Sequence, residues 1–378
     1  MDPPIPGVCW RLLRVGARRL ANAPSRCPYS GGVAFIQHRR GARRLASLVA
    51  IGASTLVLAS CAASQAHSAP DKPHGQSGNQ HSIAPGMPLP GPAALVPFGS
   101  GAIAGQGAWH AVGRLVRGIP AVYETKLVPP GGRRPAGIAW MDTHLLSARL
   151  YSGSISPGGR GYRYTAPIEP AQAATVVAAF NGGFKMRDAH GGYFTEGRMV
   201  DPLRPGAASL VIYSDGNVDI GAWGRDVTMT GQVVSVRQNL VPLVADGQPT
   251  QAAEGNWRAW GDTCGKVSCA VSVPGIEHQW RSGLGVTGDG ALVYVTGPAL
   301  APVQLADLLV RAGAVRAMQL DINPYWPVFV TYDPATASGL AEPSNGSKLL
   351  ASTVQGPATF FKSAWARDFI TLSARPAG

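Results

Sequence analysis

The amino-acid sequence predicts an α+β fold, with strand-rich mixed sheets and a few packed helices. Short β-rich segments, bounded by Gly, Asp and Asn turns, recur along the second half of the chain. We expect them to form strands at 174–180, 208–214, 227–236, 282–288 and 291–297. A single segment has a clear helical pattern. Many strands with few helices are typical of the α+β class.

Turn and cap residues place the elements more closely. Asp215-Gly216 and Asp289-Gly290 each stand between two β-rich runs and predict hairpins. In PVQLADLLVRAGA, Pro302 suits the first turn of a helix and Gly313 its C-terminal cap. The next segment, VRAMQLD, is expected to be a strand that ends at Asp321.

Residues 283–288 match the pattern GxGxxG, but the context argues against a nucleotide site. A dinucleotide-binding loop needs a helix after its glycines, so that the helix N-terminus can meet the pyrophosphate. Here Asp289-Gly290 forms a turn and a second strand follows. We therefore interpret these glycines as part of a β-hairpin.

The charge of the chain is concentrated near its N-terminus. The whole chain has a formal net charge of +12, and its first 60 residues hold nine arginines against the single acid Asp2. Residues 61–378 hold 24 basic and 20 acidic residues, a net charge of +4. Because nucleic-acid binding needs a basic patch on the folded part, no nucleic-acid partner is predicted.

A signal for export follows this basic leader. Arg43-Arg44 precedes the apolar run LASLVAIGASTLVLAS, and Leu58-Ala59-Ser60-Cys61 resembles a bacterial lipobox. Residues 1–61 are thus expected to be a basic leader with a lipoprotein-type signal, with a lipid on Cys61 that anchors the protein to the outer face of the bacterial cell membrane. A plain transmembrane anchor is the alternative, although the run is short for a span.

The exported part divides into a tether and one domain. Residues 62–93 are rich in Ser, Pro, Gly and His and cannot bury a core, which predicts a flexible tether. Residues 94–378 are expected to form a single domain. Cys264 and Cys269 in TCGKVSC are predicted to form a disulfide, with free thiols or metal ligands as the alternatives.

Four short stretches carry candidate site residues. AFNGGFK offers Asn181, Gly182, Gly183 and Lys185, and its alternative role is a tight turn. HGGYFTEGRMVDP brings Glu196 beside Arg198, which could equally be a solvated ion pair on a loop. WRSGLGVT places Arg281 at the start of a strand, where its guanidinium could hold a carboxylate or phosphate, unless it is an ordinary surface arginine.

The stretch Asp321–Trp326, DINPYW, raises a choice of its own. An aspartate that ends a strand can simply cap the next turn, and Asn-Pro is a strong turn former. A carboxylate beside Asn323, Tyr325 and Trp326 would also suit a sugar, whose ring packs on aromatic carbons while polar groups take its hydroxyls. Both interpretations predict the same backbone and differ in function.

Taken in order, these blocks resemble the phosphodiester glycosidase family. AFNGGFK resembles the family's strand ending in Asn-Gly-Gly-Phe, and WRSGLGVTGDGALVYVTG resembles its hairpin. PVQLADLLVRAGAVRAMQLD resembles its helix and the strand ending in Leu-Asp. The likeness covers about 174–330. After Leu-Asp the family usually continues with glycines and serines, whereas this chain has Ile-Asn-Pro-Tyr-Trp.

The resemblance implies a hydrolase that removes a sugar from a sugar-1-phosphodiester. It implies Asp321, Glu196 and Arg281 as catalytic residues, with Arg281 and Lys185 holding phosphate. It implies that the remaining candidates, Asn181, Gly182, Gly183, Asn323, Tyr325 and Trp326, bind substrate. No cofactor is predicted; a divalent cation that bridges Asp321 and phosphate is left open, although no ligand spacing argues for it.

Two alternatives come from other classes of protein. One is a surface lipoprotein that binds a cell-envelope glycan without cleaving it, and the other is a structural envelope protein that keeps only the fold. The expected partners are a carbohydrate or glycophosphodiester and, through the N-terminal lipid or signal anchor, a membrane.

Overall fold

The computed structural model describes residues 87–99, 103–255, 257–261, 277–337 and 339–376, all within one compact unit, Gly78–Gly378. The leader, the signal-like run, Cys61, Cys264 and Cys269 lie outside the described residues. Lipidation, anchoring and the disulfide therefore stay predictions. Within the described ranges, no helix has the length and hydropathy of a membrane span.

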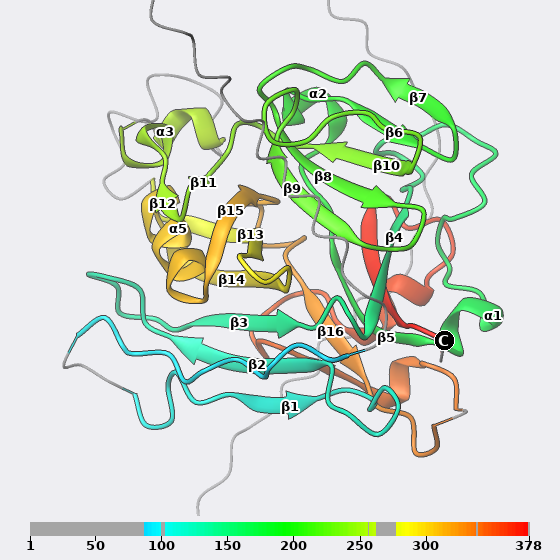
Figure 1. The fold of residues 1–378 in the computed structure, drawn as a ribbon, viewed down its shortest axis with the longest axis horizontal. Helices are drawn as coiled ribbons and strands as arrows, with labels where there is room; N and C mark the ends of the chain where they lie inside the picture. Colours follow the sequence, from blue (N-terminus) through cyan, green and yellow to red (C-terminus); the bar gives the residue numbers. More distant parts are fainter. Residues whose placement is uncertain (1–86, 100–102, 256, 262–276, 338, 377–378) are drawn as a thin grey trace, which may run out of the picture. The chain divides into compact units, whose positions relative to one another are not determined.

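Three antiparallel sheets make up the fold (Figure 1). The largest has the order β1-β2-β3-β14-β13-β15-β11-β12. Its strands are β1 (His110–Val112), β2 (Val122–Leu127), β3 (Ala136–Met141), β11 (Val244–Ala245), β12 (Gln248–Pro249), β13 (Gln279–Thr287), β14 (Leu292–Leu300) and β15 (Ala314–Gln319).

The other two sheets have five strands each, in the orders β7-β6-β10-β8-β9 and β17-β16-β5-β18-β4. The first holds β6 (Tyr193–Thr195), β7 (Arg198–Asp201), β8 (Ala208–Tyr213), β9 (Val218–Ala222) and β10 (Val233–Gln238). The second holds β4 (Leu146–Tyr151), β5 (Val176–Asn181), β16 (Phe329–Tyr332), β17 (Gly346–Lys348) and β18 (Phe369–Ala374).

The described helices are short and few, so the expected α+β class with strand-rich sheets is confirmed. The α-helices are α1 (Pro170–Ala173), α2 (Met186–Ala189), α3 (Gln251–Gly255) and α5 (Pro302–Arg311). Single 3-10 turns occur at η1 (Trp257–Trp260), η2 (Pro343–Asn345) and η3 (Pro357–Phe361).

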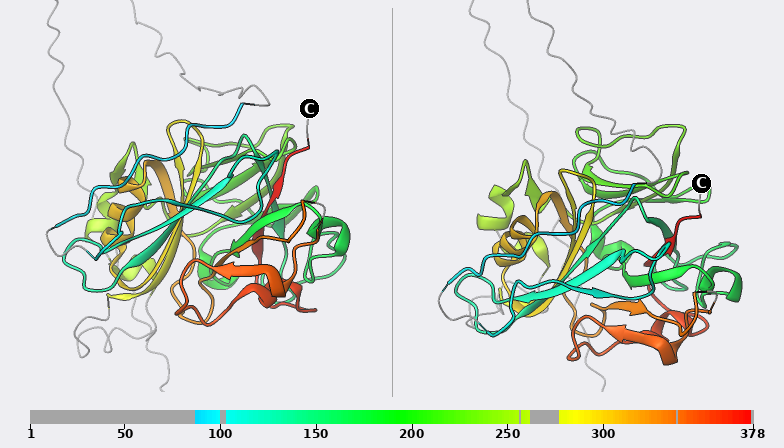
Figure 2. Two further views of the ribbon diagram at one scale, coloured as in Figure 1. Left: turned by 90° about the horizontal axis from the view of Figure 1, so that it is seen from below. Right: turned by 60° about the horizontal axis from the view of Figure 1, so that its bottom comes forward.

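The helix expected after Pro302 is confirmed as α5. Pro302 occupies its first turn, and the side-chain oxygen of Gln304 accepts a hydrogen bond of 2.9 Å from the Ala301 amide. Gly313 follows the helix with a φ of 96°, a left-handed conformation that glycine adopts without strain. The apolar face of α5 packs on β13, β14 and β15 (Figure 2).

Both expected hairpins are confirmed. β8 pairs with β9 around Gly216, and β13 pairs with β14 around Gly290. Both glycines have positive φ, 79° and 92°. The GxGxxG glycines lie on β13 and its turn, so the structure has a strand where a nucleotide loop would need a helix.

The strand expected at 227–236 is shorter than the sequence predicts, because β10 begins only at Val233. Residues 228–232 are exposed, and Val227 makes only an isolated bridge with Trp223. The Val233 amide instead closes a turn on the Thr230 carbonyl at 3.2 Å. A β-rich composition without an apolar face to bury does not hold the segment in the sheet.

The main apolar core lies where the three sheets meet, and it includes Met141, Phe180, Tyr294 and Phe329. A second core fills the space between the largest sheet and α5. β5 and β15 therefore end inside the protein. The residues that follow their ends, at 182–185 and 320–323, are held by packed elements on several sides.

The N-terminal segment makes contacts with the domain from residue 87 onward. The Leu89 amide donates to Asp142 at 2.9 Å, and Trp109 Nε1 donates to the Ala93 carbonyl at 2.9 Å. Leu89 and Phe98 pack against the second core. The last residues of the expected 62–93 tether thus lie against the domain; its boundary at 94 stays a prediction.

Candidate active site

A broad pocket opens beside the ends of β5 and β15. It is lined by residues from the start of α2, from the loop between β7 and β8, and from the turn after β15. Its charged lining residues are Lys185, Arg187, Asp188, Arg204, Asp321 and Arg367. The four cations outnumber the two acids, which favours an anionic ligand.

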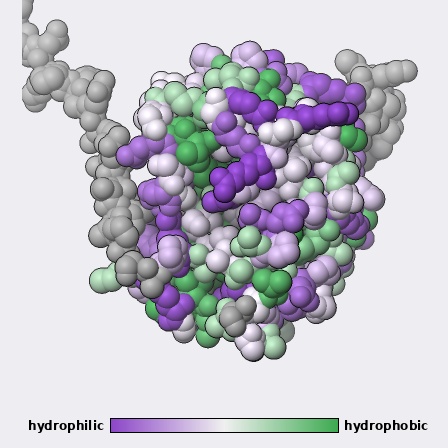
Figure 3. All heavy atoms as spheres, turned by 90° about the vertical axis from the view of Figure 1, so that its right-hand side faces the viewer, coloured by the Kyte–Doolittle hydropathy of each residue, from purple (hydrophilic) through white to green (hydrophobic). Residues whose placement is uncertain are grey.

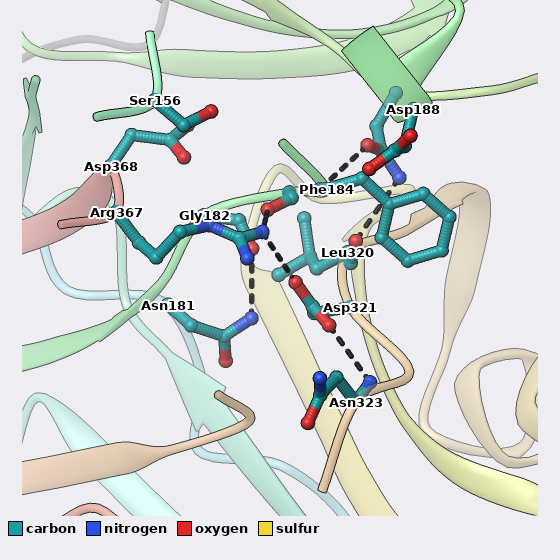
Figure 4. A network of polar contacts seen from close by, with 12 residues as sticks. Ser156, Asn181, Gly182, Phe184, Asp188, Leu320, Asp321, Asn323, Arg367 and Asp368 are labelled. Atoms are coloured by element: carbon teal, nitrogen blue, oxygen red, sulfur yellow. Dashed lines mark hydrogen bonds and ion pairs between the residues drawn. The ribbon is translucent and has the colours of Figure 1, made fainter. Parts of the chain in front are cut away.

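Asp321 lies at the inner wall of this pocket and is only 2% exposed. One carboxylate oxygen accepts a hydrogen bond from Arg367 at 2.6 Å, and the other accepts one from the Asn323 amide at 2.9 Å (Figure 4). Burial raises the pKa of Asp321 to about 6, while Arg367 acts in the opposite direction. The group can therefore exchange a proton close to neutral pH.

The turn after Asp321 is both a capped turn and part of the pocket. Asn323 Oδ1 accepts the Tyr325 amide at 3.0 Å, which closes the turn. Asn323 and Trp326 also line the pocket. The two interpretations of this stretch that the sequence left open are thus compatible.

Aromatic rings gather next to the carboxylate. Trp326 lies edge-on to Tyr325 at 4.9 Å and to Trp365 at 5.4 Å, measured between ring centroids. The Arg367 guanidinium lies 4.9 Å from the Trp326 ring centre. Tyr325 is half exposed, so a ring surface remains open to solvent beside the charged pocket.

Two buried ion pairs flank the loop after β5, and sequence reasoning missed both. Arg367 pairs with Asp321 at 2.6 Å, and Arg237 pairs with Asp368 at 2.7 Å. Arg367 also donates to the Gly183 carbonyl. These partners are separated by 46 and 131 residues along the chain. No local motif reveals such a pairing; the only signal is an Arg-Asp dipeptide before the apolar strand β18.

Lys185 occupies the position that the sequence predicts for a phosphate ligand. It lines the pocket, and among the described residues its ammonium group has no ion pair. Arg204 lines the same pocket from the loop after β7 and was not among the sequence candidates. Within the described part of the chain, neither cation has an ion pair, and both could therefore meet an anion.

Asn181 has a different environment from the one expected. Its amide donates to the Gly182 carbonyl at 2.8 Å and to Ser282 at 3.0 Å. Its oxygen accepts from the Tyr294 hydroxyl at 2.7 Å and from the Val328 amide at 3.0 Å. These four bonds use the full capacity of a side-chain amide. Asn181 joins β5 to its neighbours and has no hydrogen bond left for a sugar hydroxyl.

Gly182 and Gly183 are explained by the side chains packed on them. A Cβ on Gly182 would lie 2.5 Å from a carboxylate oxygen of Asp368. On Gly183 it would lie 2.7 Å from the Asn239 oxygen and 2.9 Å from the Arg237 guanidinium carbon. The paired glycines thus make room for these buried polar side chains. Both also line a small cavity that includes Asp321 and Trp326, so their contact with substrate stays a prediction.

Arg281 is fully buried and its guanidinium is used within the protein. It donates to the carbonyls of Leu300 and Glu277 at 2.7 and 2.9 Å and to the Gln319 side chain at 2.6 Å. Burial lowers its pKa to about 9. The side chain does not line the pocket. The structure thus gives Arg281 a role in packing, in place of the expected contact with phosphate.

Glu196 also lies apart from the pocket. It is in the turn between β6 and β7, where its carboxylate accepts the amides of Arg163 and Tyr164, each at 2.9 Å. Arg198 is 3.8 Å away. The solvated loop interaction that the sequence left open describes this residue better than a second catalytic carboxylate does.

A protein-family model matches the part of the chain that contains β5 and Asp321. Residues 174–321 match the family model of the phosphodiester glycosidases. The matched segment runs from just before β5 to Asp321. For this segment the resemblance seen in the sequence is confirmed as a phosphodiester glycosidase domain, and the match suggests a glycosidase-type function. The lipoprotein form stays a prediction.

Solved structures give more distant likenesses. The catalytic domain of zebrafish N-acetylglucosamine-1-phosphodiester alpha-N-acetylglucosaminidase is 15% identical, with a TM-score of 0.40, over 71% of this chain and 88% of that one. A hypothetical protein from Synechocystis is 13% identical, with a TM-score of 0.36, over 68% and 63%. An exported protein from Burkholderia pseudomallei is 13% identical, with a TM-score of 0.28, over 63% and 74%. Among curated proteins, none matches the chain.

Proposed function

We propose that this protein is an exported hydrolase that cleaves a sugar from a sugar-1-phosphodiester or a related cell-envelope glycan. The observation that carries the proposal is the position of Asp321. This residue ends the segment that matches the family and lies at the wall of a pocket rich in cations. Export and anchoring through Cys61 rest on the sequence alone.

In the proposed reaction, water attacks the anomeric carbon and the bond from that carbon to the phosphate oxygen breaks. Asp321 takes the proton of the attacking water, and its pKa of about 6 suits a base that works near neutral pH. The electron pair of the broken bond leaves on the phosphate monoester. Because a phosphate monoester is a weak base, the reaction has less need of a strong general acid than ordinary glycoside hydrolysis.

The proposal assigns phosphate binding to Lys185, Arg204 and Arg367. All three line the pocket, and electrostatic stabilisation by fixed cations is effective where charge develops on a leaving phosphate. Arg367 binds Asp321 in the free protein, and its donor groups could be shared with a bound phosphate. Trp326 and Tyr325 supply the aromatic surface for the sugar ring.

The test is the release of free sugar from a panel of sugar-1-phosphodiesters by the purified protein. Each substrate is paired with a neutral glycoside of the same sugar. We expect release from a phosphodiester, little from its neutral partner, and none with Asp321→Asn. Asp246→Asn, which removes an exposed acid outside the pocket, should leave the rate unchanged.

One observation favours a second candidate, a glycan-binding protein without turnover. The negative charge of Asp321 is balanced by its ion pair with Arg367, and the open aromatic surface lies beside this pair. Binding of a glycan on the panel, with a folded protein and no product from any substrate, would support that candidate instead. An absence of both binding and turnover would leave a structural role for the fold.

A further inference from the structure

A second charged surface lies away from the pocket, on the loop at 159–165. This loop is fastened to the hairpin of β6 and β7. Glu196 accepts two of its backbone amides, and Arg198 donates to the carbonyls of Arg160 and Gly161, each at 3.2 Å. Glu196 and Gly197 form the hairpin turn with φ of 52° and 72°. The contacts hold the loop in one arrangement on the sheet.

Arginine and tyrosine side chains stack on this loop. The Arg149 guanidinium lies 4.1 Å from the centre of the Tyr164 ring, and that of Arg163 lies 5.2 Å from the same ring. Arg198 lies 4.4 Å from the centre of the Tyr162 ring. Stacking on a ring fixes the plane of a guanidinium while its N–H groups remain free at the edge.

We call this surface the arginine–tyrosine face. Its members are Arg149, Arg160, Tyr162, Arg163, Tyr164 and Arg198. All four arginines are exposed, and hydrophilic side chains gather in the upper part of the view that shows this side, over the loop and the β6–β7 hairpin (Figure 3). Within the described ranges, Glu196 is the acid that ion-pairs with the face, through Arg198, and the guanidinium groups of Arg149, Arg160 and Arg163 make no ion pair.

We propose that the arginine–tyrosine face binds an acidic glycan chain, one that carries carboxylate or phosphate groups along its length. Within the described ranges, the stacked guanidinium groups of Arg149 and Arg163 and the exposed one of Arg160 have no acidic partner. Three such groups on one face suit repeated anionic groups on one flexible polymer. Both tyrosine rings already hold guanidinium groups at stacking distance. They therefore offer little of the open aromatic surface that single-stranded nucleic acids need.

This inference does not rest on the proposed hydrolysis. Its measured quantity is binding, and none of the face residues lines the pocket. The experiment can therefore succeed or fail whatever the outcome of the sugar-release test.

The experiment measures binding of an oligogalacturonate to the purified full chain at low and physiological salt. A triple variant, Arg149→Gln with Arg160→Gln and Arg163→Gln, removes three charges from the face. The control, Arg117→Gln with Arg133→Gln and Arg134→Gln, removes three exposed charges elsewhere. A neutral maltooligosaccharide of equal length is the control ligand.

We expect the face variant to bind about tenfold more weakly at low salt, with less dependence on salt, and the control variant to stay within about twofold of the wild type. Arg160→Gln alone should also weaken binding. Since Arg160 stacks on none of the described rings, that variant reports on the charge without removing a ring contact from the loop.

Equal losses in the two triple variants would overturn the proposal, because the effect would then follow net charge. Absence of oligogalacturonate binding at low salt would overturn it as well. Tighter binding of single-stranded DNA or of phosphatidylglycerol vesicles, lost in the face variant, would show that the face serves another partner and that the glycan assignment is wrong.

Discussion

Asp321 and Arg367 form the pair on which the chemistry of the pocket depends. Burial disfavours the charged carboxylate, and the arginine at 2.6 Å stabilises it. The result is a pKa of about 6, well above that of an exposed aspartate. Burial and Arg367 act in opposite directions on the pKa of Asp321, and together they suit this carboxyl group to proton exchange near neutral pH.

The first prediction concerns pH. A general base acts in its deprotonated form, so kcat/KM should fall as pH decreases through about 6. Arg367→Met removes the cation that lowers the pKa of Asp321, so the midpoint of the pH–rate profile should move to higher pH. Arg367→Lys keeps a cation and should shift this midpoint less. Profiles of the wild type and both variants check this. A midpoint that does not respond to Arg367 would contradict the role given to Asp321.

The environment of Arg281 could not be predicted from the residues beside it in the sequence. The sequence suggested an arginine at the start of a strand that could hold phosphate, yet this guanidinium is buried and binds backbone carbonyls and Gln319. Nothing local in WRSGLGVT distinguishes the two environments. The difference comes from Leu300, Gln319 and Glu277, which the fold brings around it.

The second prediction follows from this position. Arg281→Lys should lower the free energy of unfolding by about 3 kcal/mol, because a lysine cannot satisfy all of the buried acceptors. If the variant folds, its KM should stay near that of the wild type. The exposed control Arg133→Lys should change neither quantity. Denaturant unfolding combined with substrate titration distinguishes a structural role of Arg281 from phosphate binding. A raised KM with an unchanged free energy of unfolding would show that Arg281 binds phosphate after all.

At the scale of elements, the sequence predicted correctly those helices and hairpins that depend on local turn and cap residues. The two hairpins follow from Asp-Gly turns, and α5 follows from its apolar face, Pro302 and Gly313. The segment before Val233 was misjudged, because strand propensity without burial does not place residues in a sheet. The loop after β5 was located correctly, but its glycines serve the packing of Arg237, Asn239 and Asp368.

The third prediction tests that packing. Gly183→Ala places a methyl group 2.7 Å from the Asn239 oxygen and 2.9 Å from the Arg237 guanidinium. We expect a loss of about 2 to 4 kcal/mol in the free energy of unfolding, since the buried Arg237–Asp368 pair must shift. Gly231→Ala, where no atom lies within 4 Å of the added carbon, should cost less than about 0.5 kcal/mol. Similar unfolding curves for the two variants would contradict this explanation of the glycine pair.

At the scale of the whole molecule, the pocket is assembled from distant parts of the chain. Lys185 follows β5, Arg204 precedes β8, Asp321 follows β15, and Arg367 precedes β18. The sequence could point to Asp321, Lys185 and Trp326 because each stands in a recognisable stretch. It could not reveal Arg204 or Arg367, whose place depends on how three sheets meet. The family match ends at 321, before Trp326 and Arg367.

The most direct test of the account is sugar release from a phosphodiester by the wild type and by Asp321→Asn, with both proteins shown to be folded. We predict free sugar from the wild type and a loss of about a hundredfold or more in the variant, as expected when a general base is removed. Equal release by the two proteins would contradict the central claim, because it would place the chemistry on a residue other than Asp321.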